Sequence, residues 1–375
     1  MLPYGRQSID ESDIEAVAAV LRGDWLTTGP TVKAFEQALV DYTGATTCIS
    51  ATSGTAALHI AYAAAGVRPG DEVVTTPLTF VATASSAMAL GATIVFADVE
   101  DDTGNLDPEA AKAAVTARTK VVAAVDYAGH PAEMDALRTV ADACDALLVE
   151  DAAHSIGSRY HGRPVGTLAD LTTFSFFPTK NMTTAEGGAV AAMDPALGLR
   201  AATFHNIGLV RDPARLRYTD EGPWHQEVHE IGLNYRLPDV LCALGLSQLK
   251  RIEAFKARRA EIVRGYNEAF ADLDGVRLPA QRSYVDPTWH LYPLRVTGGR
   301  RREVFEKLRA AGIGVQVNYI PVYWHPVFED LGYRRGMCPV AERYYSEEIS
   351  LPVFADLTSA DAERVIDEVR RAVVG

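Results

Sequence analysis

The sequence is poor in cysteine and lacks the common glycine motifs of nucleotide-binding proteins. Its four cysteines, Cys48, Cys144, Cys242 and Cys338, lie far apart and form no C-x-x-C pair. Neither a zinc site nor a redox dithiol is therefore predicted, and we expect no metal. G-x-x-x-x-G-K-[ST] and G-x-G-x-x-G are also absent, which leaves P-loop and Rossmann dinucleotide sites without support.

Positive charge and long apolar runs are scarce as well. The chain has 36 Lys and Arg against 49 Asp and Glu, a formal net charge of -13, which repels the phosphate backbone of a nucleic acid. No apolar run approaches the length of a bilayer span, and no basic-then-apolar leader is present at the start. With the isolated thiols, these features favour a cytoplasmic protein that binds neither nucleic acid nor membrane.

Apolar and helical segments alternate along the first two thirds of the chain, which is typical of a mostly parallel sheet covered by helices on both faces. Polar or acidic residues end several of the apolar runs, and ligands of such sheets bind at the carboxyl ends of the strands. The seven expected strands lie around 48–49, 72–76, 93–98, 120–126, 146–151, 171–176 and 188–193.

The pattern changes after roughly residue 245. Residues 249–270 form one long charged amphipathic pattern, which predicts a helix that leads into a smaller α+β domain. Strands are expected at 290–296 and 314–318, and a helix at 359–374. A further helix is expected near the start, where 8–11 has the form of a capping box. We therefore predict a large domain over 1–248 and a small domain over 249–375.

Lys180 is the first candidate for chemistry. It is the only charged residue in the fifteen-residue segment LTTFSFFPTKNMTTA, which covers 171–185. A lysine on a surface loop is the ordinary interpretation. The alternative is a desolvated amine that stays neutral and nucleophilic, as imine formation with an aldehyde requires.

Two further segments fit the same chemistry. Asp151 ends an apolar run; it could cap a turn, or it could hold the protonated ring nitrogen of pyridoxal phosphate (PLP). The segment 52–58, TSGTAAL, passes from a strand into an Ala-rich helix, whose free N–H groups suit a phosphate dianion as well as ordinary N-capping.

In order along the chain, these segments resemble the nucleotide-sugar aminotransferases of the DegT/StrS family. Four motifs carry the resemblance: SGTAAL at 53–58, EDAAHS at 150–155, SFFPTKNMTTAEGG at 175–188 and GLNYRL at 232–237. The resemblance covers nearly the whole chain. It implies an α/β protein with the PLP-dependent transferase type I (aspartate aminotransferase) fold, a mostly parallel seven-stranded sheet and a smaller α+β C-terminal domain.

The resemblance also implies roles for individual residues. Lys180 would form the Schiff base with PLP and transfer protons, Asp151 would hold the pyridine nitrogen, and His154 would lie near the 3-oxygen of the ring unless it is an ordinary core histidine. Asn234 would reach the cofactor phosphate of a neighbouring subunit, which implies a homodimer with shared active sites. The remaining implied cofactor contacts are Gly54, Thr55, Phe80 and Ser175.

Transamination is the reaction that the resemblance implies, since the family's dehydratases have histidine in place of the lysine. The N-terminal segments GRQSIDESDIEAV and DWLTTGP look most like enzymes that aminate a UDP-linked 4-keto-6-deoxy sugar in the pseudaminic acid pathway, with L-glutamate as donor. FFPTKNM departs from that group because it lacks the histidine often found beside the lysine, so a dTDP-linked sugar stays open. Candidate sugar contacts, which could equally be packing residues, are Trp25, Thr27, Tyr319 and His325.

Three alternatives to this function stay open. The first is a 3-keto-sugar aminotransferase of the same family. The second is a type I PLP enzyme of other chemistry, such as a desulfurase, for which Cys338 is the only candidate thiol. The third is a family member that has lost its catalytic activity.

Overall fold

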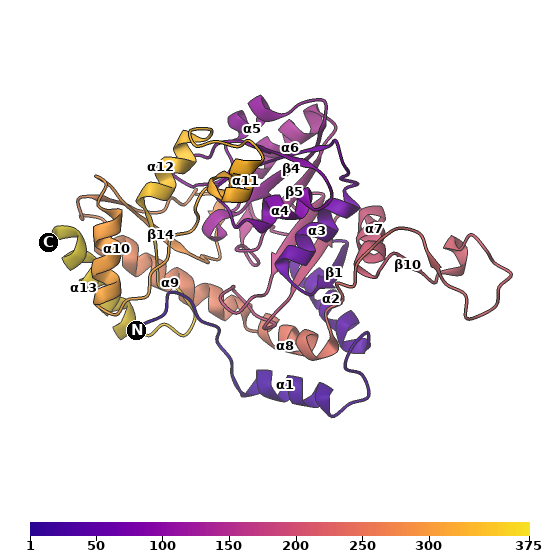
Figure 1. Ribbon diagram of the computed structural model, residues 1–375. Coiled ribbons are helices and arrows are strands. Elements are labelled where there is room, and N and C mark those ends of the chain that lie inside the picture. The colour runs from indigo at the N-terminus through magenta and orange to yellow at the C-terminus, as the bar shows by residue number, and fades with distance from the viewer.

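A seven-stranded sheet forms the centre of the protein in the computed structural model, which describes residues 1–375 (Figure 1). The strand order is β1-β9-β8-β5-β4-β2-β3. β9 pairs antiparallel with both of its neighbours and every other pair is parallel, which confirms a mostly parallel seven-stranded sheet. The strands are β1 (Thr47–Ala51), β2 (Glu72–Thr75), β3 (Thr93–Phe96), β4 (Thr119–Val125), β5 (Leu147–Asp151), β8 (Leu171–Ser175) and β9 (Gly188–Ala192).

Both faces of the sheet are covered by helices, which explains the uninterrupted apolar runs. Along β4, Val121 and Ala123 pack into one hydrophobic core, while Val122 and Ala124 pack into the other. The first core also takes residues of α3 (Gly54–Ala64), α4 (Ala82–Met88) and α7 (Pro195–His205). The second takes residues of α2 (Pro30–Thr43), α5 (Pro108–Ala114), α6 (Met134–Ala143) and α8 (Asp239–Leu249).

The first helix, α1 (Glu11–Leu21), begins two residues later than a capping box at 8–11 would place it. Asp10 is the N-cap residue, and its carboxylate accepts hydrogen bonds from the backbone N–H groups of Ser12 and Asp13. The carboxylate of Asp13 accepts one in return from the N–H of Asp10. The capping box is thus formed by two aspartates, and the expected one with Ser8 was wrong.

A third hydrophobic core lies in the C-terminal part of the chain. It is built on α9 (Ile252–Phe270), α10 (Arg301–Ala310), α13 (Ser359–Val374) and a small sheet of β12 (Val276–Arg277), β14 (Tyr292–Val296) and β15 (Glu348–Leu351). The N-terminal segment also reaches this part, since Leu2 pairs with Ile313. The division of the chain at 248/249 stays a prediction.

Two sequence expectations in this part were wrong. The amphipathic pattern from residue 249 is divided between α8 and α9, so the long helix begins only at Ile252. The segment 314–318 forms no strand, because only Gln316 pairs with Ser350. Two residues further on, the backbone N–H of Asn318 donates to the carboxylate of Glu348 instead, at 2.7 Å.

An extended arm projects from the body of the protein beyond α7 (Figure 1). It contains the short hairpin of β10 (Leu209–Val210) and β11 (Glu227–Val228). Large apolar side chains are exposed there, among them Trp224 at 80% and Ile231 at 88%. None of the helices of the protein combines the length and apolar character that crossing a membrane requires.

Candidate active site

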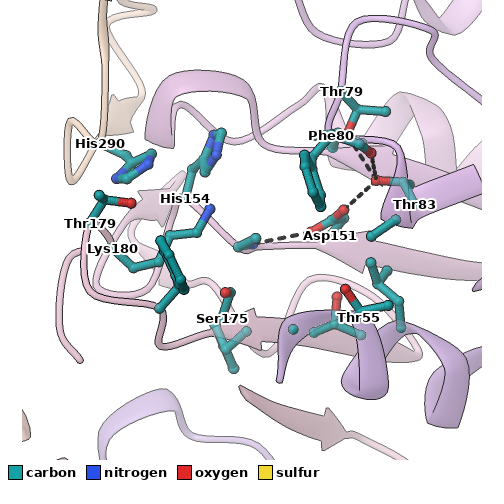
Figure 2. A pocket seen from close by; sticks show the side chains of 18 of the residues that line it. Thr55, Thr79, Phe80, Thr83, Asp151, His154, Ser175, Thr179, Lys180 and His290 are labelled. Carbon is teal, nitrogen blue, oxygen red and sulfur yellow. Dashed lines mark hydrogen bonds between the residues drawn. The ribbon is translucent and has the colours of Figure 1, made fainter. Parts of the chain in front are cut away.

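Lys180 lies in the loop between β8 and β9, at the edge of the sheet where β8 ends. Its amine points into a cavity shared with His154 and Asp151 (Figure 2). The adjacent Asn181 fixes the loop, because its side-chain amide donates to the backbone carbonyl of His154 at 2.8 Å. Burial lowers the pKa of Lys180 to about 8, against an opposing effect of the Asp151 charge. The amine is therefore neutral far more often near neutral pH than an exposed lysine, whose pKa is about 10.4.

Asp151 is the last residue of β5, with only 5% of its surface exposed. The hydroxyl of Thr83 donates to its Oδ2 at 2.6 Å, and the backbone N–H of Ala153 donates to its Oδ1 at 3.2 Å. Burial raises the pKa of this carboxyl, whereas the two hydrogen bonds and Lys180 oppose the rise. No arginine pairs with the Asp151 side chain, so its charge is available to a cationic ligand in the cavity.

The N-terminus of α3 forms the floor of the same cavity (Figure 2). Ser53 caps the helix by accepting from the N–H of Ala56 at 3.1 Å, and Gly54 and Thr55 begin its first turn. A side chain at Gly54 would place its Cβ 2.7 Å from the Cβ of Ser175, so only glycine permits this close approach. Free N–H groups and two hydroxyls thus surround a position suited to an anion.

Aromatic and imidazole rings form the remaining wall. His154 Nε2 lies 3.1 Å from the hydroxyl of Tyr319, and the Phe80 and Tyr319 ring centroids are 6.2 Å apart. The ring of His290 lies against that of His154, with 4.3 Å between centroids. Burial lowers the pKa of both histidines well below the ordinary value, and the Nδ1 of each is buried without a partner. Both rings are therefore neutral and have unused hydrogen-bonding capacity.

The cavity has a volume of about 510 Å³, and its donor set fits PLP. A carboxylate and an amine share one space, with a helix N-terminus and a flat exposed aromatic ring beside them. This combination matches a cofactor with a cationic ring nitrogen, an aldehyde, a flat ring and a phosphate dianion. The predicted site residues that line the cavity are Gly54, Thr55, Phe80, Asp151, His154, Ser175, Lys180 and Tyr319.

Four predicted contacts lie outside the cavity of the single chain. Asn234 is exposed and pairs with Asn206 at the base of the arm. Trp25 and Thr27 are exposed in the loop after α1, and His325 is half-buried and precedes α11 (Pro326–Asp330). Their assignments to cofactor and sugar stay predictions.

Sequence reasoning missed two residues that shape the site, Thr83 and His290. Thr83 lies in α4 and contacts Asp151 across 68 residues of sequence. Thr83 follows Thr79 by four residues, and the two hydroxyls lie 2.8 Å apart. This spacing is the one local signal in the sequence that the two threonines lie on the same side. His290 precedes β14 in an apolar segment, where no sequence pattern distinguishes it from a core residue.

Comparisons with known proteins identify the family of the chain. The model of the DegT/DnrJ/EryC1/StrS aminotransferase family matches residues 7–370. The chain is 37% identical over 374 residues to the UDP-4-amino-4,6-dideoxy-N-acetyl-beta-L-altrosamine transaminase of Campylobacter jejuni, covering 98% of this chain and 96% of that protein.

Solved structures superpose closely on the whole chain. The sugar aminotransferase Spr1654 of Streptococcus pneumoniae in its PMP form gives a TM-score of 0.93 at 30% identity, covering 100% of this chain and 99% of that one. Helicobacter pylori PseC, an aminotransferase of pseudoaminic acid biosynthesis, gives 0.92 at 31% identity, with 100% and 99% covered. These matches confirm the predicted type I fold, the aminotransferase activity and the cofactor. The chain therefore belongs to the DegT/DnrJ/EryC1/StrS aminotransferase family and is a PLP-dependent sugar aminotransferase.

Proposed function

We propose that this enzyme transfers the amino group of L-glutamate to a nucleotide-linked 4-keto-6-deoxy sugar, in two half-reactions that use the cofactor in turn as amine acceptor and amine donor. The observation that carries the proposal is the placement of Lys180 and Asp151 in one cavity, where Glu186 is the only other charged side chain. PLP supplies the electron sink for this chemistry when it is bound.

Each residue of the cavity would have its own role in the reaction. Lys180 would bind the cofactor and, once released from it, take up and return a proton at its Nζ, because a neutral amine can act as a base and then as an acid. Asp151 would hold the ring nitrogen in its protonated form. His154, a neutral imidazole, would hydrogen-bond the 3-oxygen of the ring. Phe80 would cover one ring face.

The phosphate would lie at the start of α3. Gly54 and Thr55 present backbone N–H groups there, and the Ser175 hydroxyl lies beside them at the end of β8. A helix N-terminus stabilises an anion through these unpaired donors and its dipole. The phosphate would thus anchor the cofactor at the end of the cavity away from the Lys180 amine.

The names of two relatives support carbon 4 of the sugar as the position that receives the amino group. The printed name of the Campylobacter jejuni protein specifies a UDP-linked 4-amino-4,6-dideoxy sugar, and PseC of Helicobacter pylori is described as part of pseudoaminic acid biosynthesis. A UDP-linked 4-keto-6-deoxy sugar is therefore our first choice and its dTDP-linked counterpart the second. Tyr319 lines the cavity and would contact the sugar, together with Trp25, Thr27 and His325 of the more exposed surface.

A homodimer with shared sites would complete the cavity. Asn234 pairs with Asn206, which directly follows α7. The arm beyond α7 projects away from the body of its own chain (Figure 1), and Asn234 would serve the phosphate site of a partner subunit. The exposed apolar side chains of the arm and of the α1 loop, including Trp25 and Ile231, support an interface there. A 3-keto sugar remains the alternative substrate within the same scheme.

The desulfurase alternative loses its candidate nucleophile. Cys338 is fully buried and does not line the cavity, and burial raises the pKa of its thiol to about 12. A thiolate that attacks sulfur must be accessible and have a low pKa. The presence of both Lys180 and Asp151 in one cavity likewise argues against a family member that has lost its catalytic activity.

The test is direct. The PLP-loaded protein is incubated with L-glutamate and a panel of UDP- and dTDP-linked 4-keto and 3-keto sugars, and the products are identified by mass and proton couplings. We expect 2-oxoglutarate and a 4-amino sugar in equal amounts. Amination only at carbon 3, or of no nucleotide-linked sugar, would overturn the substrate assignment.

A further inference from the structure

Two acidic side chains lie directly behind the cofactor site, on the face of the sheet opposite to Asp151. Glu150 precedes Asp151 on β5, and Asp126 follows the last residue of β4. Both side chains are 0% exposed. Neither forms an ion pair with a lysine, arginine or histidine. The fold therefore places two adjacent carboxyl groups in the interior without a counter-charge.

The hydrogen bonds of the two groups are unequal. Asp126 Oδ1 accepts from the backbone N–H of Ala132 at 3.0 Å, and its Oδ2 accepts from the Ser155 hydroxyl at 2.6 Å. Glu150 Oε2 accepts from Thr172 at 2.8 Å, whereas its Oε1 is buried without a partner when both groups are taken as ionised. A buried orphan oxygen beside a carboxylate is satisfied if it carries a proton and donates it.

We propose that Glu150 is protonated and donates a hydrogen bond to ionised Asp126, and that this acid pair positions Asp151 and His154 for the cofactor. Glu150 lies opposite Ala124 in the register of β5 and β4, two residues before Asp126 on the same face, and each carboxyl acts on the pKa of the other. Two neighbouring carboxyls without a counter-charge cannot both stay ionised in the interior, so they share one proton. Asp126 keeps the charge because it already accepts from two donors. Burial raises the pKa of both carboxyls, that of Glu150 well above its ordinary value, and the hydrogen bonds from Ser155 and Ala132 oppose the rise for Asp126.

The pair acts on the site through the backbone. The N–H of Asp126 donates to the carbonyl of Asp151 at 3.2 Å, which holds the end of β5 against β4. Ser155, which donates to Asp126, directly follows His154. Asp126 thus contacts both ends of the segment 151–155, which presents the two cofactor residues: its backbone N–H holds Asp151, and its ionised side chain holds Ser155. Glu150 and Asp126 are accordingly positioning residues that do not contact the ligand.

We expect the charge of Asp126 to act on the cavity as well, because Asp126 and Asp151 interact electrostatically. Lys180 faces Asp151 across the cavity, and the remaining contacts of the acid pair are uncharged: the hydroxyls of Ser155 and Thr172 and the backbone N–H groups of Ala132 and Gly166. A negative charge on Asp126 favours the protonated form of Lys180. The pKa of Lys180 therefore reports which of the two acids is ionised. This readout rests on the proposed role of Lys180.

Two near-isosteric variants locate the proton. Glu150→Gln replaces a neutral acid with a neutral amide that can still donate to Asp126, so it should leave the pKa of Lys180 and the thermal stability close to wild type. Asp126→Asn removes the charge and should lower the pKa of Lys180 by roughly half a unit or more. The pKa is read from the pH dependence of the rate at which PLP attaches to the apoprotein. Glu72→Gln, a buried carboxylate paired with Arg118 outside the cavity, is the matched control and should shift nothing.

Infrared difference spectra give a second readout that needs no cofactor. Wild type minus Glu150→Gln should show the C=O band of a protonated carboxyl at neutral pH, and wild type minus Glu72→Gln should not. An equal or larger pKa shift in Glu150→Gln than in Asp126→Asn, no shift in either, or no band assigned to Glu150 would each overturn the proposal.

If PLP attaches to a lysine other than Lys180, the proposed function fails, and the infrared band still decides where the proton lies. Should Asp126→Asn not fold, Glu150→Gln alone decides through the same band and the unshifted pKa.

Discussion

The hydrogen bond from Thr83 to Asp151 sets how strongly the cavity holds an ionised carboxylate. It spans 2.6 Å between two buried groups. A hydrogen bond to a charged acceptor contributes about 1.5–3 kcal/mol, which corresponds to roughly 1–2 units of pKa. Burial already raises the pKa of Asp151, and Thr83 opposes this rise. Replacing Thr83 with the near-isosteric valine should therefore raise the pKa of Asp151 further, by about that amount.

The sign of the effect on pH dependence follows from the role of Asp151. The carboxylate must be ionised to hold a protonated ring nitrogen, so activity falls as the pH drops through its pKa. Thr83→Val should move the acid limb of kcat/KM upward by roughly 1–2 pH units and weaken PLP binding at pH 7 about tenfold. The assays are kcat/KM across pH and titration of the apoprotein with PLP.

Two controls separate this effect from a general loss of packing. Thr83→Ser keeps the hydroxyl and should keep the wild-type acid limb. Thr75→Val removes another buried threonine hydroxyl, which donates to the carbonyl of Ala123 at 2.9 Å outside the cavity. Thr75→Val should lower the stability of the protein without moving the acid limb of kcat/KM. Equal shifts in Thr83→Val and Thr75→Val would refute the reasoning.

Three further predictions follow from the cofactor and dimer assignments. Lys180→Ala should lose the visible absorption of the protonated Schiff base, and borohydride reduction with peptide mapping should mark Lys180 in wild type; a mark on another lysine contradicts the assignment. Asp151→Asn should retain PLP but lose most turnover, because a neutral amide does not keep the ring nitrogen protonated. Lys180→Ala and Asn234→Asp, each inactive alone, should recover roughly a quarter of wild-type activity when mixed in equal amounts, since half of the dimers then hold one intact site; no recovery after confirmed subunit exchange rejects shared sites.

The sheet could be predicted because its strands are buried on both faces. Alternate residues of β4 enter two different cores, so the run carries no polar interruption and is distinct from its amphipathic neighbours. Strand direction could not be read in this way. The reversal of β9 depends on its pairing with β8 and β1, which no local pattern encodes. The break between α8 and α9 was missed because the apolar spacing runs through it.

The part of the candidate site that lies at the ends of strands could be predicted from the sequence. Asp151 and Ser175 end β5 and β8, and the edge of the sheet brings them together with Lys180. Thr83 and His290 come from a helix and a distant loop, so their contacts exist only in the fold. The hydrogen bond from Asn318 to Glu348, found where a strand was predicted, likewise joins residues that only the fold brings together.

The charges of Lys180 and Asp151 depend on each other. Burial lowers the pKa of the amine to about 8 and raises that of the carboxyl, and each group opposes the shift of the other. Removing the carboxylate charge therefore makes the amine neutral at lower pH, which favours its attack on an aldehyde. The same change removes the partner of the ring nitrogen. Asp151→Asn should thus attach PLP at least as fast as wild type near neutral pH while turning over far more slowly, a divergence that a general loss of structure would not produce.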